Sequence, residues 1–147
     1  MGRPIEDDYL FVGPLIVARL VAVVPDVPVE LVERAEQVLQ ADQRAMVIKV
    51  MWAGDAPVAT DERSRTRSSQ IIRQRWLVLL AMNNASPLPA ARSTAAGPTL
   101  SKMHKALHGF EPEGAHRAMQ RAAAAMAPTF TNTQAICPLG FEITLSL

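Results

Sequence analysis

The chain has 147 residues, of which 49% are apolar and 20% are charged, a composition that argues against disorder over most of its length and fits one domain, 1–147. The formal net charge of +1 hides an asymmetry, because residues 1–62 hold 11 acidic and five basic side chains whereas residues 63–147 hold three and 10. Such halves can meet copies of the same chain head to tail, and the single cysteine excludes an internal disulfide.

An apolar stretch from Tyr9 to Pro25 predicts the first helix, over about Gly13–Val24, because its apolar residues recur at helical spacing. Pro14 suits the first turn of such a helix. Arg19 and two prolines interrupt the stretch, which is therefore a poor candidate for a signal peptide or a membrane span. We expect a buried helix and no association with a membrane.

A second helix is predicted over about Val29–Gln40. Asp26-Val27-Pro28 is typical of a helix start. The apolar residues that follow lie on one stripe, with glutamates and glutamines opposite.

Two strands are predicted next, paired as a long hairpin. Ala45–Ala53 alternates apolar side chains with Lys49 on the other face, and Gln70–Met82 is a longer strand of the same kind. The polar residues between them, Gly54–Ser69, are typical of a long connection.

The C-terminal part begins with a loop over Asn83–Pro89 and a helix over about Ala90–Leu107, for which Gly97-Pro98 suggests a late start. In Ala115–Ala127, four consecutive alanines favour helix by propensity. The final residues, from Leu139 to Leu147, alternate as in a half-buried strand. The pattern predicts an α+β fold in which an antiparallel sheet of about four strands has helices packed on one face.

The sequence contains no GxxxxGK[ST] phosphate loop, no GxSxG elbow, no HExxH motif and no CxxC pair, and we expect no enzyme, no cofactor and no bound metal. His104 and His108 share one helix face, but a zinc ion needs a third ligand, such as His116 or Glu111, from a loop that folds back. Two solvent-facing histidines are the favoured interpretation. Cys137 has no base near it in sequence, which favours a small buried side chain over a nucleophile.

The most unusual local feature is an acid-free cluster of arginines that consists of Arg63, Arg65, Arg67, Arg73 and Arg75. The last two share one face of the second strand, and the other three belong to the connection before it. The cluster can lie near nucleic-acid phosphates, pair with acids on a neighbouring copy, or form a solvated hairpin tip that protects strand edges from aggregation. We keep these three interpretations open.

Taken together and in this order along the chain, the segments of the sequence resemble those of the tail terminator (tail completion) proteins of long-tailed bacteriophages. The resemblance covers nearly the whole chain and rests on five segments: GPLIVARLVAVVPDV (Gly13–Val27), AMVIKVMWAG (Ala45–Gly54), QRWLVLLAMNN (Gln74–Asn84), AAGPTLSKMHKALHGFEP (Ala95–Pro112) and CPLGFEITL (Cys137–Leu145). The most specific pieces are QRWLVLLAMNN and the pairing of AGP with ALHGFEP.

The resemblance implies a structural protein without catalytic residue or cofactor. Such proteins form a ring, typically a hexamer, that docks on the head-proximal end of the tail tube, stops tube polymerisation and presents the surface that joins the head–tail connector, while DNA passes through the lumen. The implied partners are further copies of the chain, the tail tube protein and the connector or stopper protein, with the sheath protein as a further candidate. The implied location is the tail neck of a virion assembled in the host cytoplasm.

The chain departs from the family pattern at Ala122–Ala125, where such proteins usually have a strand, and the helical character of Val29–Gln43 is stronger than in many relatives. The resemblance therefore predicts a strand around Met119–Phe130 against local propensity. It also predicts that Arg63, Arg65 and Arg67 lie near the lumen or near the acidic surface of a neighbour. The alternative function is a small nucleic-acid-binding module that uses the arginine cluster; an enzyme of unknown type is a third possibility.

Overall fold

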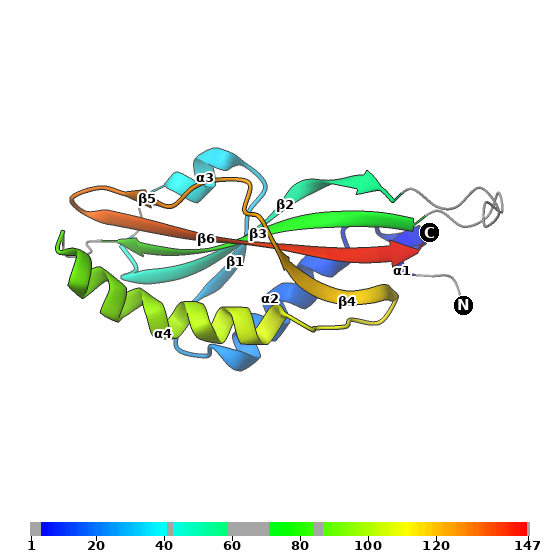
Figure 1. The fold of residues 1–147 in the computed structure, drawn as a ribbon, viewed down its shortest axis with the longest axis horizontal. Helices are drawn as coiled ribbons and strands as arrows, with labels where there is room; N and C mark the ends of the chain where they lie inside the picture. Colours follow the sequence, from blue (N-terminus) through cyan, green and yellow to red (C-terminus); the bar gives the residue numbers. More distant parts are fainter. Residues whose placement is uncertain (1–3, 41–42, 59–70, 84–86, 147) are drawn as a thin grey trace.

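A twisted sheet runs the length of the molecule (Figure 1). The computed structural model describes residues 4–40, 43–58, 71–83 and 87–146. In chain order, the strands are β1 (Val29–Leu31), β2 (Met46–Pro57), β3 (Ile71–Asn83), β4 (Ala115–Ala122), β5 (Thr129–Phe130) and β6 (Gln134–Ser146). The helices are α1 (Pro4–Asp7), α2 (Val12–Val23), α3 (Ala35–Leu39) and α4 (Pro89–Leu107).

The six-stranded sheet has the order β1-β2-β3-β6-β4, and β5 pairs with β6. β1 and β2 are parallel, and every other pair is antiparallel. β4 and β5 lie on the same edge of β6, β4 opposite 140–145 and β5 opposite 135–136. The predicted α+β class and antiparallel pairing are confirmed, and the sheet is larger than the four strands expected.

The predicted hairpin is β2 and β3, which pair from Met46 opposite Met82 to Pro57 opposite Ile72. The register shifts between Trp52 and Asp55, where Gly54 has a φ of 100°, a backbone conformation that glycine adopts without strain. β3 is central and is buried on both faces from Trp76 onward, which explains its continuous apolar run. The predicted connection carries Arg63, Arg65 and Arg67, which lie outside the described residues.

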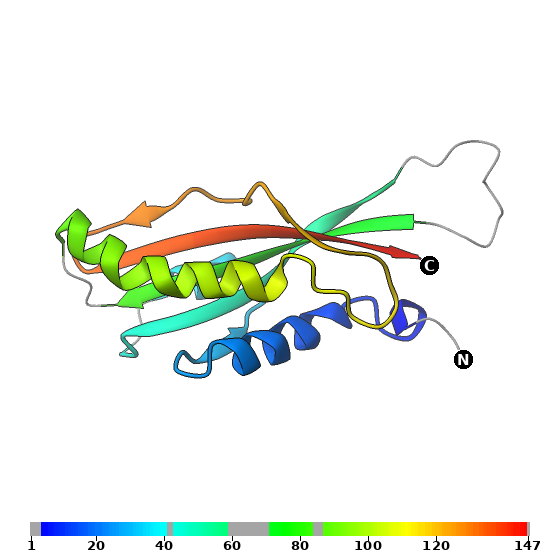
Figure 2. The same cartoon turned by 60° about the horizontal axis from the view of Figure 1, so that its bottom comes forward.

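One face of the sheet is covered by α2 and α4, which lie side by side (Figure 2). The main core fills this interface and takes side chains from both helices and from all the long strands, among them Leu20, Trp76, Met103 and Phe141. Arg19 on α2 links the two helices, because its Nε donates a hydrogen bond of 3.1 Å to the Ala106 carbonyl near the end of α4. The first predicted helix is thus confirmed.

The opposite face is half covered, which corrects the expectation that helices pack on one face alone. Val38 of α3 packs there with a second core cluster that includes Leu77 and Leu79, and Ala124 and Met126 of the segment after β4 complete it. This face is apolar from 77 to 81 on β3 and becomes polar toward the hairpin tip, at Arg73 and Arg75. A helix is needed only over the apolar half.

The predicted helix over Val29–Gln40 is wrong for its first six residues. Val29–Leu31 forms β1 beside β2, and the Val32 amide donates to the Val50 carbonyl. β-Branched valines favour strand, and the backbone of β2 provides hydrogen-bonding groups along its edge for β1. The local helical spacing of the sequence contains no information about this pairing. Only α3 remains helical, and the Gln37 side chain accepts hydrogen bonds from the Glu33 and Arg34 amides at its start.

The late helix start at Gly97-Pro98 is also wrong, because α4 begins at Pro89 and continues through both residues. Gly97 and Pro98 are exposed, so water can satisfy the carbonyl that Pro98 leaves without an amide partner. Within the described residues, no helix is both long enough and apolar enough to cross a membrane.

The alanine-rich segment is not a helix, and the strand that the resemblance implied around Met119–Phe130 is present only at its two ends, because residues 123–128 between β4 and β5 form neither strand nor helix. β4 ends at Ala122, and β5 follows at Thr129–Phe130. Between them the backbone crosses close above β6, where a Cβ on Gly140 would lie 2.5 Å from the Ala123 carbonyl oxygen. The final strand is longer than expected, since β6 begins at Gln134.

Candidate functional site

Three arginines from two strands share the uncovered half of the sheet face opposite α2 and α4. Arg73 and Arg75 alternate along β3 and are exposed. Across β6, Arg73 is level with Thr144, which in turn is level with Arg117 on β4. Arg75 is level with Glu142 in the same way. We call Arg73, Arg75 and Arg117 the arginine face.

The arginine face keeps a net positive charge. Glu142 is the acidic residue in its register, and its Oε1 lies 3.8 Å from the Arg73 Nε. Both side chains are partly exposed, at 44% for Arg73 and 26% for Glu142, so the pair is screened by water and weak. A single carboxylate cannot neutralise three guanidinium groups, and the face can attract phosphates or carboxylates.

The sequence predicted two of these three residues. Arg117 was missed because it follows the arginine cluster by more than 40 residues and belongs to the segment whose type was in doubt. Nothing in the sequence fixes the register of β4, and two irregularities in its pairing with β6 obscure the alternation. Only the sheet places Arg117 level with Arg73 across β6.

An exposed apolar patch lies at the β1 edge of the sheet. Tyr9, Leu10, Leu31 and Trp52 are all at least 36% exposed, and the Tyr9 and Trp52 rings meet edge to face with centroids 6.2 Å apart. A hollow of 260 Å³ opens here, lined by Leu10, Leu31, Val32, Glu33, Trp52 and Trp76. We call this surface the β1-edge patch.

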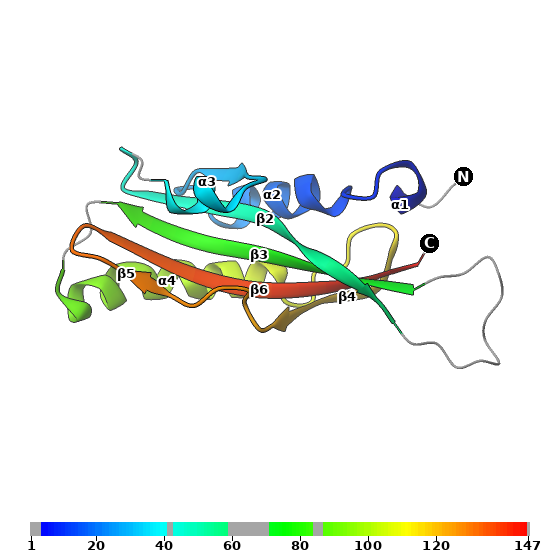
Figure 3. The same ribbon diagram turned by 90° about the horizontal axis from the view of Figure 1, so that it is seen from above.

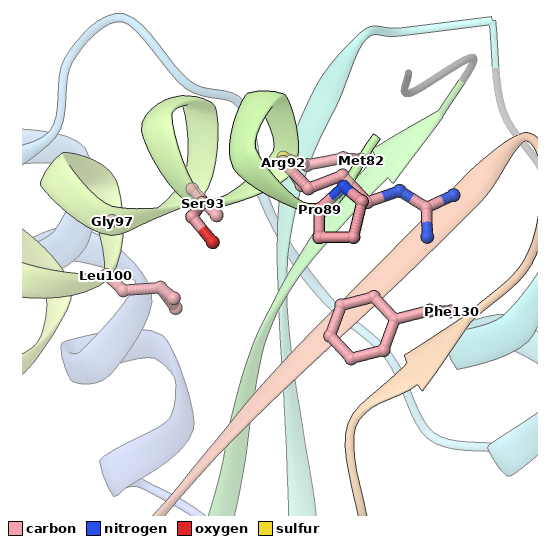
Figure 4. A pocket seen from close by; sticks show the side chains of 8 residues that line it. Met82, Pro89, Arg92, Ser93, Gly97, Leu100 and Phe130 are labelled. Atoms are coloured by element: carbon pink, nitrogen blue, oxygen red, sulfur yellow. The ribbon is translucent and has the colours of Figure 1, made fainter. Parts of the chain in front are cut away.

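A larger hollow lies near the opposite edge, between the first half of α4 and β5 (Figure 4). Its volume is 450 Å³, and it is lined by Met82, Pro89, Arg92, Ser93, Ala96, Gly97, Leu100 and Phe130. The Arg92 guanidinium lies 5.7 Å from the Phe130 ring centroid and donates a hydrogen bond to the Thr131 carbonyl. We call this surface the α4–β5 pocket.

Cys137 lies on β6 and is half-buried. Burial raises the pKa of its thiol, and the positive charge of Arg92 opposes that shift to a smaller extent. The thiolate is the nucleophilic form of cysteine. A raised pKa leaves the thiol protonated at neutral pH, which fits the predicted role as a packing residue.

His104 and His108 stack on each other with ring centroids 5.2 Å apart. His104 is half-buried and lies 6.3 Å from the Phe141 ring centroid, whereas His108 is exposed and its Nδ1 accepts a hydrogen bond of 3.4 Å from the Arg121 amide. Among the residues that the structure describes, no group of three or more His, Cys, Asp or Glu side chains is placed to hold a metal ion. The pair is explained by packing.

A polar hollow of 370 Å³ between β1 and α3 is built from groups that bind each other. Glu30 accepts a hydrogen bond of 2.9 Å from Arg44. Lys49, which is 2% exposed, donates from its Nζ to the carbonyls of Gln37, Val38 and Gln40. These groups hold α3 to the sheet, and the hollow contains no pairing of a nucleophile with a base.

In the part of the chain that the structure describes, the main candidate surfaces are a positive sheet face and two apolar hollows near opposite edges. Comparison with known proteins gives this arrangement a context. The model of the phage tail terminator protein family matches residues 6–147. Among curated proteins, none is significantly similar to this chain in sequence.

Two solved structures have the same fold. A chain of the virion of a native gene transfer agent particle is 12% identical, with a TM-score of 0.52, and the alignment covers 90% of this chain and 92% of that one. A second solved chain, described only by a sequence identifier, is also 12% identical, with a TM-score of 0.53, and the alignment covers 99% of this chain and 98% of that one.

Proposed function

Since the chain belongs to the phage tail terminator family and is therefore a structural protein of a phage tail, we propose that it closes the head-proximal end of the tail tube as a ring. The ring ends tube polymerisation, presents the surface that the head–tail connector joins, and lets DNA pass through its lumen. The observation that carries this proposal is the family match, which spans residues 6–147 rather than one motif.

The surfaces support the proposal in physical terms. A subunit of a ring needs two different contact areas for its neighbours, and one that also seats on a tube and a connector needs more. The described residues offer apolar hollows near both edges of the sheet and a separate positive face. Neither hollow contains a candidate set of nucleophile, base and orienting group.

The proposal is tested by removing the gene from the phage or prophage that encodes it and examining the particles by electron microscopy. We expect tails longer than normal that remain separate from filled heads, and we expect the wild-type gene supplied in trans to restore both length and joining. Tails of normal length joined to heads without the protein would refute the proposal.

We further propose that the arginine face, together with Arg63, Arg65 and Arg67, lies toward the lumen or toward the acidic surface of a neighbour. In the same complementation assay, replacement of Arg73, Arg75 and Arg117 together by glutamate is expected to lower DNA retention or ring formation at least tenfold. The matched triple lysine variant keeps the charge and is expected to behave like wild type. Equal performance of the glutamate variant would remove the arginine face from this role.

The same arginines support the alternative of a nucleic-acid-binding module. That function predicts that the isolated monomer binds DNA with a steep dependence on salt, since each phosphate contact releases counterions. Terminator function does not require such binding. Salt-sensitive DNA binding by the monomer, together with normal tails in its absence, would favour the module.

A further inference from the structure

We propose that the β1-edge patch of one copy packs into the α4–β5 pocket of the next copy, so that these two surfaces form the contact between neighbouring subunits. The inference rests on the proposed ring and goes beyond it by naming the surfaces and their anchoring residues. The partner it assigns to both surfaces is a second copy of this chain.

The β1-edge patch has the character of a protein interface. Leu31 is 49% exposed and Trp52 is 39% exposed, and Tyr9 packs on Trp52 edge to face. Large aromatic side chains next to an apolar hollow are typical anchors of protein contacts, because they bury much area with few rotatable bonds. In a lone subunit the same side chains stay in water, which is unfavourable.

The α4–β5 pocket is a receptor of suitable size and chemistry. Most of its lining is apolar, and Phe130 at its border is 57% exposed. Figure 4 shows Leu100 and Phe130 on two sides of the hollow, with the Arg92 guanidinium beside Phe130. A hollow of 450 Å³ can take several apolar side chains from a neighbour, whereas water gains few hydrogen bonds inside it.

Charge favours contact between unlike edges. Glu33 lines the hollow of the β1-edge patch, and Arg92 lines the α4–β5 pocket. On a larger scale, residues 4–40 carry seven acidic and two basic side chains, whereas residues 87–130 carry two acidic and five basic. Figure 3 shows α1, α2 and α3 toward one edge of the sheet and α4, β4 and β5 toward the other, although α2 and α4 pack against each other between these edges. Two copies therefore attract each other through unlike edges and repel through like edges.

The position of the two surfaces selects the symmetry. They lie near opposite edges of one sheet, so a contact between them is head to tail and leaves one free copy of each surface at the ends of a pair. Such contacts continue until a ring closes. β1 has three residues and β5 has two, so at these two surfaces the edge strands offer few backbone groups for strand addition, and side chains must provide the contact.

The inference is tested with two single variants, Leu31→Asp for the β1-edge patch and Phe130→Asp for the α4–β5 pocket. The size of the purified protein is measured by light scattering and native mass spectrometry. Each variant alone lacks one surface in every copy and is expected to be monomeric. An equimolar mixture has one intact contact, between the β1-edge patch of the Phe130 variant and the pocket of the Leu31 variant, and is expected to stop at dimers.

Val21→Asp is the matched control, because Val21 is 51% exposed on α2 and lines neither hollow. It is expected to assemble like wild type. Circular dichroism checks that each variant is folded. Leu10→Asp and Ser93→Arg change the same two surfaces and replace either primary variant that fails to fold.

The outcomes separate this inference from the proposed function. If both variants still form rings of the wild-type size, or if their mixture stays monomeric, the assignment of the two surfaces is wrong. The proposal that the protein forms a ring is unaffected by either result. Wild-type protein that remains monomeric at high concentration and on purified tails overturns the ring and the assignment together. Dimers that form in the mixture but in neither variant by itself support the assignment. Surfaces that bind some other protein would not produce such dimers.

Discussion

Gln74 occupies a position on β3 where alternation places apolar side chains toward α2 and α4. It is fully buried, and its Nε2 donates a hydrogen bond of 2.7 Å to the Tyr9 carbonyl, while its Oε1 accepts one of 3.2 Å from the Trp76 indole. In the sequence, Gln74 is a polar residue among the apolar residues of this strand face, and the local pattern gives no reason for it. The structure supplies the reason, because the amide ties the segment before α2 to the central strand and satisfies a buried tryptophan.

At this scale we predict that Gln74→Leu lowers the free energy of unfolding by about 1–3 kcal/mol, since it leaves the buried Trp76 N–H without an acceptor. Chemical denaturation followed by tryptophan fluorescence measures the change. Gln120→Leu is the matched control, because Gln120 is exposed on β4, and such changes alter stability by about 0.5 kcal/mol or less. Equal stability of the two variants would show that the Gln74 hydrogen bonds contribute nothing.

The helix α3 shows how an element can depend on one side chain from elsewhere. Its five residues are too few to be stable alone. Lys49 on β2 holds it, because the ammonium group donates to the Gln37 carbonyl at 2.5 Å and to two further carbonyls at the helix end. A positive charge at a helix C-terminus also interacts favourably with the helix dipole. α3 in turn covers part of the apolar half of the second sheet face, through Val38.

We therefore predict that Lys49→Met, which keeps most of the side-chain volume, frees α3 from the sheet. Hydrogen exchange of residues 35–39 should accelerate at least tenfold, and the free energy of unfolding should fall by about 1–3 kcal/mol, since buried carbonyls lose a charged donor. Lys102→Met on the exposed side of α4 is the control and should change neither. If residues 35–39 exchange at the wild-type rate in the Lys49 variant, Lys49 does not hold α3.

Helices and strands were predictable where apolar residues recur with a clear period within a single segment. The hairpin strands, α2 and the end of β6 follow from alternation or helical spacing that burial then confirms. β1 and β4 were not predictable from local pattern, because each is a strand only through its pairing with a neighbour that is distant in sequence. The sequence also did not reveal the role of Gly140, which leaves room for the backbone at Ala123 to cross above β6.

On the scale of the whole molecule, one core connects almost every element. The main cluster includes residues of α1, α2, α4 and the long strands, and the sheet joins strands from both halves of the chain. The acidic and basic halves of the sequence therefore cannot be separate units. Among the described residues, the acidic segment 4–40 supplies the β1 edge of the sheet and the basic segment 87–130 supplies the β4 edge, and the proposed contact between copies uses these two edges.

We predict that the dissociated chain unfolds in a single cooperative transition, with a heat-capacity change of about 1.8–2.2 kcal/mol/K for a chain of this length. Calorimetry of the Phe130→Asp variant, in which assembly is blocked, measures it. The melting temperature of wild type should also rise with concentration, because assembly stabilises the native state. Two resolved transitions in the variant would contradict a single domain.

The candidate surfaces also divide into residues that the sequence predicted and residues that only the structure brings together. Two of the three residues of the arginine face are visible in the sequence, as neighbours at alternating spacing on one strand. Arg117 and both apolar hollows combine residues separated by 20 or more positions. No local signal joins such residues, since the register of the sheet and the placement of α4 bring them together.

The sequence by itself determined the family, the α+β class, the hairpin and the unequal distribution of charge, because these depend on residue order and on periodicity within single segments. Only the tertiary structure decided that Val29–Leu31 is a strand, that α3 needs Lys49, and that the charges and apolar hollows lie near opposite edges. Those features depend on strand pairing and side-chain packing between segments that are distant in sequence. The contacts that stabilise them form only when the chain folds, so no single segment of the sequence reveals them.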